Sequence, residues 1–150
     1  MAKSAPTPET DRAAAMGLLA RAPVAQLESL FGDMPAHTLL RCPEIGTVMV
    51  RGRQSGTGAP FNLGEITVTR CTVRLDCGTV GHAHVQGRDR DHARRAAVLD
   101  AVLQTDQAAA VSEAVLAPLA RAEAARRDAR AAKAAATKVE FFTLVRGEDQ

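Results

Sequence analysis

The chain has 150 residues, 46% of them hydrophobic and 24% charged, which is typical of one soluble globular domain. With 19 Lys and Arg against 17 Asp and Glu, the charge balance argues against nucleic acid or an anionic membrane as partner. The chain has no Trp or Tyr and only four Phe, which further disfavours a protein that stacks nucleic-acid bases.

The first part of the chain predicts a polar tail followed by two helices. Residues 1–9 are polar and contain two prolines, so we expect a flexible tail there. The pattern becomes helical from Thr10, and Pro23 is expected to open a second short helix. Gly32 and Pro35 should end that helix.

The middle of the chain predicts antiparallel strands, because β-branched residues dominate it. The strands are expected at residues 37–42, 47–53, 65–75 and 79–86. "PEIG" (43–46) reads as a turn, and "QSGTGAPFNLG" (54–64) as a glycine-bearing loop. Asp76-Cys77-Gly78 predicts a short hairpin loop with Gly78 in a left-handed conformation.

The last part of the chain predicts helices and one further strand. Asp89 is expected to cap a helix that carries Leu99 and Leu103 at helical spacing. Another helix should begin near Asp106, and Pro118 should kink it or open a new one. The Ala-rich stretch that follows is either a solvated helix or an arm that docks on another subunit. "KVEFFTLVRG" reads as a final strand, so the fold class is α+β with a mostly antiparallel sheet, N-terminal helices, a central helix pair and a C-terminal strand.

Three of the four histidines lie in "GHAHVQGRDRDHA" (81–93), which raises the question of a metal site. His82 and His84 would share one face of a strand, but His92 falls on the following helix. No Cys or Glu completes a ligand set at a familiar spacing. We therefore expect no metal, no catalytic residue and no cofactor in this chain.

Two groups of residues are candidates for binding an anion or another subunit. Arg88 and Asp89 stand at the strand-to-helix corner after Gly87, where free helix N–H groups could receive a phosphate. The alternative is an ordinary corner with a capping carboxylate. Arg70 and Arg74 should share one strand face and could grip an anionic ligand or pair with carboxylates.

The cysteines Cys42, Cys71 and Cys77 have no zinc-type or redox-type spacing. Reduced thiols in a cytoplasmic protein are the simplest interpretation. The N-terminus lacks the apolar region of a signal peptide, and no apolar run is long enough to span a membrane.

Several stretches, taken in order, resemble the PhnG family of bacterial phosphonate metabolism. They are "GTVMVRGRQSGTGAPFNLGEITVTRCTVRL", "GTVGHAHVQGRDRDHARRAAVLDAVL", "LAPL" and "VEFFTLVRGED". The most specific parts are Val85 to Asp89, the helix with Asp100-Ala101, and the terminus from Phe141 to Gly147. The chain departs from the family at His82 and His84, where relatives commonly carry aromatic side chains. On this basis residues 10–150 are expected to form a single PhnG-like domain.

The resemblance implies a subunit of the carbon–phosphorus lyase core complex, with PhnI, PhnH and PhnJ as partners. Together with PhnH, PhnI and the PhnL-type subunit, it is required to displace adenine from ATP with a phosphonate, giving ribose 1-methylphosphonate 5-triphosphate. The resemblance transfers no catalytic residue, so a structural or assembly role is expected, with ATP used by the complex. The alternatives are that Arg88 or Arg70 joins a shared ATP and phosphonate site, or that the chain is a free-standing anion-binding protein.

The C-terminal run is expected to hold a partner as well as to join the sheet. Phe141 and Phe142 are adjacent, so on a strand they point to opposite sides. One ring can enter the domain's own core, and the other then requires a second cover, such as a neighbouring subunit with Arg146 at the rim. The alternative is that both rings are buried internally.

Overall fold

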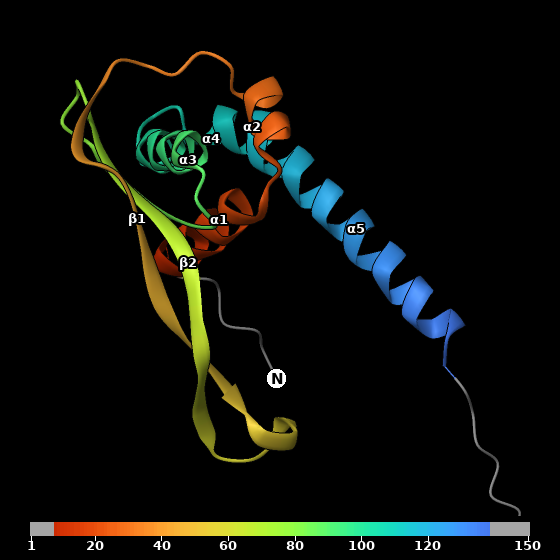
Figure 1. Cartoon of the computed structure of the whole chain (residues 1–150). Helices are drawn as coiled ribbons and strands as arrows, with labels where there is room; N and C mark the ends of the chain where they lie inside the picture. The colour runs from red at the N-terminus through yellow and green to blue at the C-terminus, as the bar shows by residue number, and fades with distance from the viewer. Residues whose placement is uncertain (1–7, 139–150) are drawn as a thin grey trace, which may run out of the picture.

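The computed structural model describes residues 8–138, which form a three-stranded antiparallel sheet covered by helices (Figure 1). The strand order is β1 (His37–Arg53), β2 (Pro60–Leu75) and β3 (Val80–Gln86). The α+β class and the antiparallel sheet are therefore confirmed. The last described element is a helix, and the strand predicted within residues 138–147 has no described residue except Lys138, so it lies outside the described part. No helix within residues 8–138 is long and apolar enough to cross a membrane.

Strand β1 corrects one prediction, because "PEIG" is not a turn. The strand runs without interruption through Pro43, and its pairing with β2 shifts register between Leu39 and Arg41 and again between Arg41 and Glu44. Extra residues of this kind bulge out of a strand and bend it without ending it. Proline is tolerated here because β1 is an edge strand, where a missing N–H removes no essential ladder bond.

The two hairpin loops agree more closely with the predictions from the sequence. The loop after β1 is shorter than predicted, with a 3-10 turn at Gln54–Gly56 and β2 already starting at Pro60. The predicted loop between β2 and β3 is confirmed, with Gly78 at φ +90°. Along β3 buried and exposed residues alternate strictly, as expected for a strand with one covered face.

Helix α3 (Arg90–Val102) covers the buried face of β2 and β3 and forms the centre of the core. Its small side chains Ala93, Ala96 and Ala97 are fully buried, which lets the helix approach the strands closely. Gly81 of β3 is needed for this approach. A methyl group at that position would lie 2.5 Å from the amide nitrogen of Ala101 and 2.8 Å from its Cβ.

Helices α1 (Pro8–Arg21) and α2 (Val24–Leu30) close the core on the side of α3. Leu19 and Leu27 are fully buried there. The predicted break at Pro23 is confirmed, with Pro23 in an extended conformation just before α2.

The C-terminal helical region consists of α4 (Ala108–Val111), a π-helical turn at Ser112–Leu116 and α5 (Ala117–Ala136). The backbone stays helical from the π turn into α5, so Pro118, near the start of α5, lacks an N–H group that would otherwise bond the preceding helical turn. In place of the predicted kink, the helix widens into the π turn directly before Pro118. Val115 and Leu119 anchor this region in the core.

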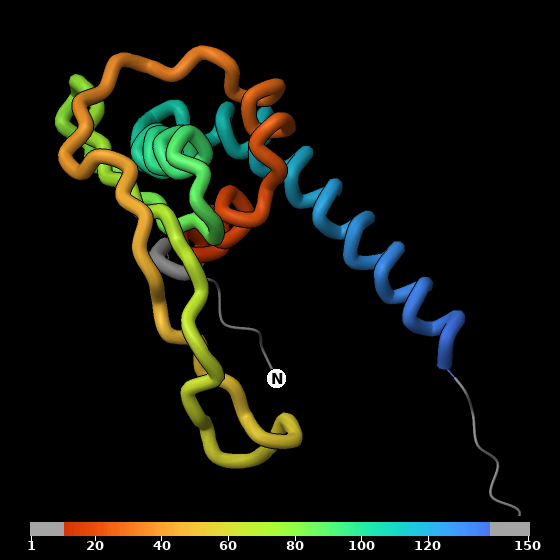
Figure 2. Tube along the Cα trace, in the orientation of Figure 1, coloured from red at the N-terminus to blue at the C-terminus, as the bar shows by residue number. Residues whose placement is uncertain are grey.

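Two parts of the chain project from the body, and their far ends are not covered by any other described element (Figures 1 and 2). One is the distal hairpin, residues 46–53 of β1 and 60–67 of β2, whose yellow tip points away from the helices. The other is α5, whose residues from Ala124 to its end are all exposed. The body supports both arms but buries neither of them.

Candidate interaction surface

The predicted basic residues on the sheet lie together on the face opposite α3. In the pairing of β2 with β3, Arg70 stands opposite His84, Thr72 opposite His82, and Arg74 opposite Val80. Arg70 and Arg74 therefore share a face, as predicted, and His82 and His84 share it with them. Arg70, His82 and His84, but not Arg74, line a shallow depression of about 250 Å³. The guanidinium of Arg70 donates to the backbone oxygen of Thr47 at 3.2 Å.

The three histidines of the 81–93 stretch have different surroundings. His82 and His84 are exposed, and Nδ1 of His82 lies 3.2 Å from the hydroxyl of Thr72. His92 is buried, and its Nε2 lies 2.8 Å from the backbone oxygen of Leu19, so it joins α3 to α1. Within residues 8–138 no three His, Cys, Asp or Glu side chains form a group that could hold a metal ion. The absence of zinc remains a prediction for metal analysis.

The strand-to-helix corner is held against β2 by two hydrogen bonds of Gly87, one to the backbone and one to a side chain. Gly87, at φ +100°, donates its N–H to Thr67 at 2.9 Å and accepts from the Thr69 hydroxyl at 2.8 Å. Asp89 accepts from the N–H of His92 at 2.9 Å, which confirms the predicted cap. One N–H group of this helix end is thus already satisfied by the protein itself. Arg88 is exposed beside it, and its predicted contact with an anion or a subunit remains a prediction.

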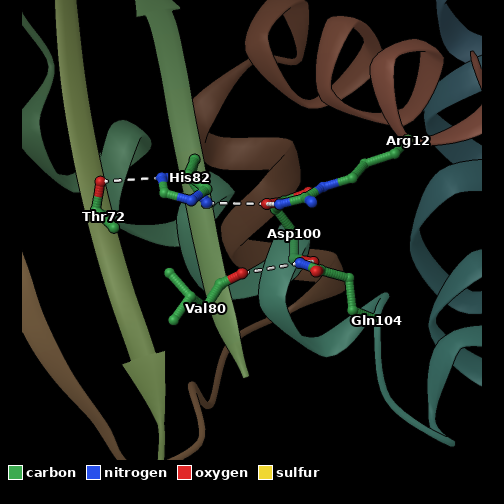
Figure 3. Close-up of polar contacts among 6 residues, drawn as sticks. All are labelled: Arg12, Thr72, Val80, His82, Asp100 and Gln104. Atoms are coloured by element: carbon green, nitrogen blue, oxygen red, sulfur yellow. Dashed lines mark hydrogen bonds and ion pairs between the residues drawn. The ribbon is translucent and has the colours of Figure 1, made fainter. Parts of the chain in front are cut away.

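A buried carboxylate on α3 holds three elements together (Figure 3). Asp100 accepts two hydrogen bonds from Arg12 of α1, from Nε at 2.9 Å and from Nη2 at 2.6 Å. It also accepts the backbone N–H of His82 at 2.8 Å. The Asp100 side chain is 5% exposed, whereas that of Arg12 is 44% exposed. The hydrogen bond to Asp100 raises the pKa of Arg12 above its ordinary value.

Together with Gln104, Asp100 also bonds two backbone groups on the outer edge of β3. Gln104 lies one turn further along the chain and donates to the backbone oxygen of Val80 at 3.0 Å. Asp100 thus accepts from the N–H of His82, and Gln104 donates to the C=O of Val80, which are the bonds that a neighbouring strand would make (Figure 3). This role of Asp100 and Gln104 was not among the predictions. Asp100 at an otherwise apolar helical stripe was the available signal, because a buried charge requires partners.

Large apolar side chains remain exposed mainly on the distal hairpin. Leu63 is 66% exposed, Met49 51% and Phe61 45%. Val48 stands opposite Ile66, and Phe61 and Leu63 both lie beside Gly52, so these residues line one face of the hairpin. The rest of the exposed large apolar residues within residues 11–138 are Leu39, Leu40, Ile45 and Ile66. Apolar groups gathered on one projecting element indicate a contact with another molecule.

The predicted partner residues Phe141, Phe142 and Arg146 lie outside the described residues, so their contact with a partner remains a prediction.

The cysteines are unpaired: Cys42 and Cys77 are exposed, and Cys71 is buried, which raises the pKa of its thiol.

Comparison with known proteins identifies the family. The family described as "Phosphonate metabolism protein PhnG" matches residues 10–147. A curated relative, the alpha-D-ribose 1-methylphosphonate 5-triphosphate synthase subunit PhnG of Rhizobium meliloti (strain 1021), is 48% identical over 141 residues, covering 89% of this chain and 88% of the relative. The family match takes in all three strands and every described helix except the first two residues of α1. The chain therefore belongs to the PhnG family of phosphonate metabolism proteins.

Proposed function

We propose that this chain is an assembly subunit of a ribose 1-methylphosphonate 5-triphosphate synthase. Its partners are PhnI, PhnH, PhnJ and a PhnL-type subunit, and the complex displaces adenine from ATP with a phosphonate. The name of the Rhizobium meliloti relative supports the reaction, and the family supports the metabolic setting. The chain itself contributes surface, and it carries neither the cofactor nor the catalytic groups.

The observation that carries this proposal is the distal hairpin. It projects from the body with Phe61, Leu63 and Ile66 exposed on one face and Met49 exposed elsewhere on it (Figure 1). Full burial of a side chain of this size contributes about 1.5–3 kcal/mol, and these side chains are 36–66% exposed, so covering each of them would contribute part of that amount. A hairpin of this kind is also marginal as an isolated structure and gains stability when a second surface covers it.

The lone chain should release no adenine from ATP and methylphosphonate. No arrangement of nucleophile, base and metal ligands is recognisable among residues 8–138, so the chemistry requires the partner subunits. Chromatographic assay of adenine compares the purified chain, the reconstituted complex and a blank. Adenine release by the purified chain above the blank would contradict the assembly role, and the reconstituted complex is the positive control.

Truncation after Thr137 should abolish co-purification with PhnI while leaving the fold intact. The removed residues include Phe141 and Phe142, half of the chain's four Phe, and Arg146. Aromatic and Arg side chains dominate the energetics of many protein interfaces. Circular dichroism and co-purification distinguish the outcomes. A truncated chain that assembles normally contradicts the contact, and one that is unfolded favours burial of both rings within the domain.

A second candidate role is favoured by the basic face of the sheet. Arg70, Arg74, His82 and His84 share that face, and none of them has an ion pair within the described residues. If this face completes a shared ATP and phosphonate site, Arg70→Ala should leave assembly unchanged and lower kcat/KM of the complex by about tenfold or more. Arg74→Ala is a matched variant on the same strand. If both variants react at the normal rate, the shared-site role is contradicted and only the assembly role remains.

A further inference from the structure

The face of α5 that enters the core continues as a basic stripe outside it. Leu119 is buried at the start of the helix, and Glu123 follows one turn later on the same face. Arg126, Arg127 and Arg130 come at helical spacing after Glu123, so they continue that face along the projecting part of the helix. The stripe is therefore apolar where the body covers it and positively charged where the body ends.

Arg21, in the last turn of α1, joins this stripe from the body. Its Nε donates to Oε1 of Glu123 at 2.7 Å, and its Nη2 donates to Oε2 at 3.3 Å. Arg127 reaches the same carboxylate from the other side at 3.9 Å. These residues, with Arg126 and Arg130, line a depression of about 210 Å³. We call the set Arg21, Glu123, Arg126, Arg127 and Arg130 the basic stripe.

The stripe carries four guanidinium groups and one carboxylate. Glu123 is shared by Arg21 and Arg127, and neither Arg126 nor Arg130 has an ion pair or hydrogen bond with a side chain among residues 11–138. The hydrogen bond from Arg21, followed by the charges of Arg21, Arg127 and Arg126, lowers the pKa of Glu123. The carboxylate is therefore fully ionised at neutral pH, and the stripe still has a net positive charge of three.

This arrangement places two like charges next to each other on the helix that carries it. Arg126 and Arg130 are four residues apart, and like charges at that spacing destabilise a helix by about 0.2–0.5 kcal/mol. The exposed alanines around them supply helix propensity but make no contact that would compensate. The opposite-charge pair Glu123 and Arg127, also four residues apart, offsets this cost, but it leaves Arg126 and Arg130 without an ion pair among the described residues. Charges placed side by side without a counter-charge of their own indicate a binding surface.

We propose that the basic stripe docks an acidic segment of a partner subunit. The inference rests on the assembly role proposed above, and it adds which surface of this chain meets a partner and which charge the partner's surface carries. A protein surface fits better than a bound phosphate, because the side chains of Arg21 and Arg127 are 60% and 76% exposed. The stripe also lies along the middle of a helix, where backbone N–H groups are already bonded and cannot bind phosphate. Between Glu123 and Arg130 it extends for about 10 Å, enough for several carboxylates in a row.

Charge reversal on the stripe tests the proposal. Arg126→Glu and Arg130→Glu, each in the full-length chain, are co-expressed with tagged partner subunits and compared with Arg121→Glu. Arg121 lies on the same helix, is exposed, and points away from the stripe. We expect each stripe variant to lower the co-purified amount by about tenfold in about 0.1 M salt, whereas Arg121→Glu leaves it unchanged. Salt at about 1 M, where the screening length falls from about 10 Å to about 3 Å, should reduce the difference.

The outcomes separate this inference from the assembly role. If the wild-type chain co-purifies with no subunit, the assembly role itself fails. If the wild type co-purifies and both stripe variants behave like Arg121→Glu, only the docking of an acidic segment fails. Titration of the isolated chain with ATP and with tripolyphosphate is the third arm. Binding of either that is lost in Arg126→Glu would assign the stripe to phosphate and overturn the proposal. Circular dichroism of every variant shows whether α5 is retained.

Discussion

Gly81→Ala should lower the free energy of unfolding by about 3 kcal/mol or more, the upper end of the range for overpacking a core. The added methyl group would lie 2.5 Å from the amide nitrogen of Ala101, and backbone cannot swing aside as a flexible side chain does. Either α3 moves away from β3 and opens the core, or β3 loses its place beside β2. Chemical denaturation of the isolated chain measures the change.

Gly64→Ala is the matched control for this variant. Gly64 also lies on a strand, but a methyl group there meets nothing within 4 Å. We expect Gly64→Ala to change stability by less than about 0.5 kcal/mol. Equal stabilities of the two variants would show that the close approach of α3 to β3 does not limit the fold.

Asp100→Ala should cost about 2–3 kcal/mol of stability. The variant removes three hydrogen bonds at once and leaves the backbone N–H of His82 without its partner at the edge of β3. Removing one partner of a fully buried ion pair costs about 3–5 kcal/mol. We expect less here because the Arg12 side chain is 44% exposed and regains water.

Arg12→Ala provides the comparison for Asp100→Ala. Asp100 keeps the N–H of His82 in that variant, but its carboxylate, which is 5% exposed, loses the guanidinium that balances its charge, so we expect a similar loss of about 2–3 kcal/mol. A double-mutant cycle with both changes isolates the Arg12–Asp100 interaction from the edge contact. A coupling energy near zero in that cycle would show that the Arg12–Asp100 pair does not contribute to stability.

The sequence predicted the features that depend on neighbouring residues. The Asp89 cap, the left-handed Gly78 and the shared face of His82 and His84 each follow from interactions over three residues or fewer. The shared face of Arg70 and Arg74 follows from strand geometry alone.

The features that the sequence did not predict depend on distant residues. Whether "PEIG" turns or bulges is decided by pairing with β2, because Glu44 stands opposite Arg70. The contact between Arg12 and Asp100 joins residues 88 positions apart, and no local pattern indicates it. The basic stripe was visible only as an Ala-rich stretch of mixed charge. The burial of Leu119 shows which face of α5 enters the core, and therefore on which face of the helix the arginines lie.

The two edges of the sheet differ in a way that limits how copies of this chain can associate. Asp100 and Gln104 bond the N–H of His82 and the C=O of Val80 on the outer side of β3, whereas no described strand pairs with the outer side of β1. A sheet with two free edges can add strands indefinitely and form fibres. Two copies that meet through β1 use up that edge in both and form a continuous sheet of six strands. Each outer edge of that sheet is then a β3 strand, where Asp100 and Gln104 compete with any further strand for two of the backbone groups.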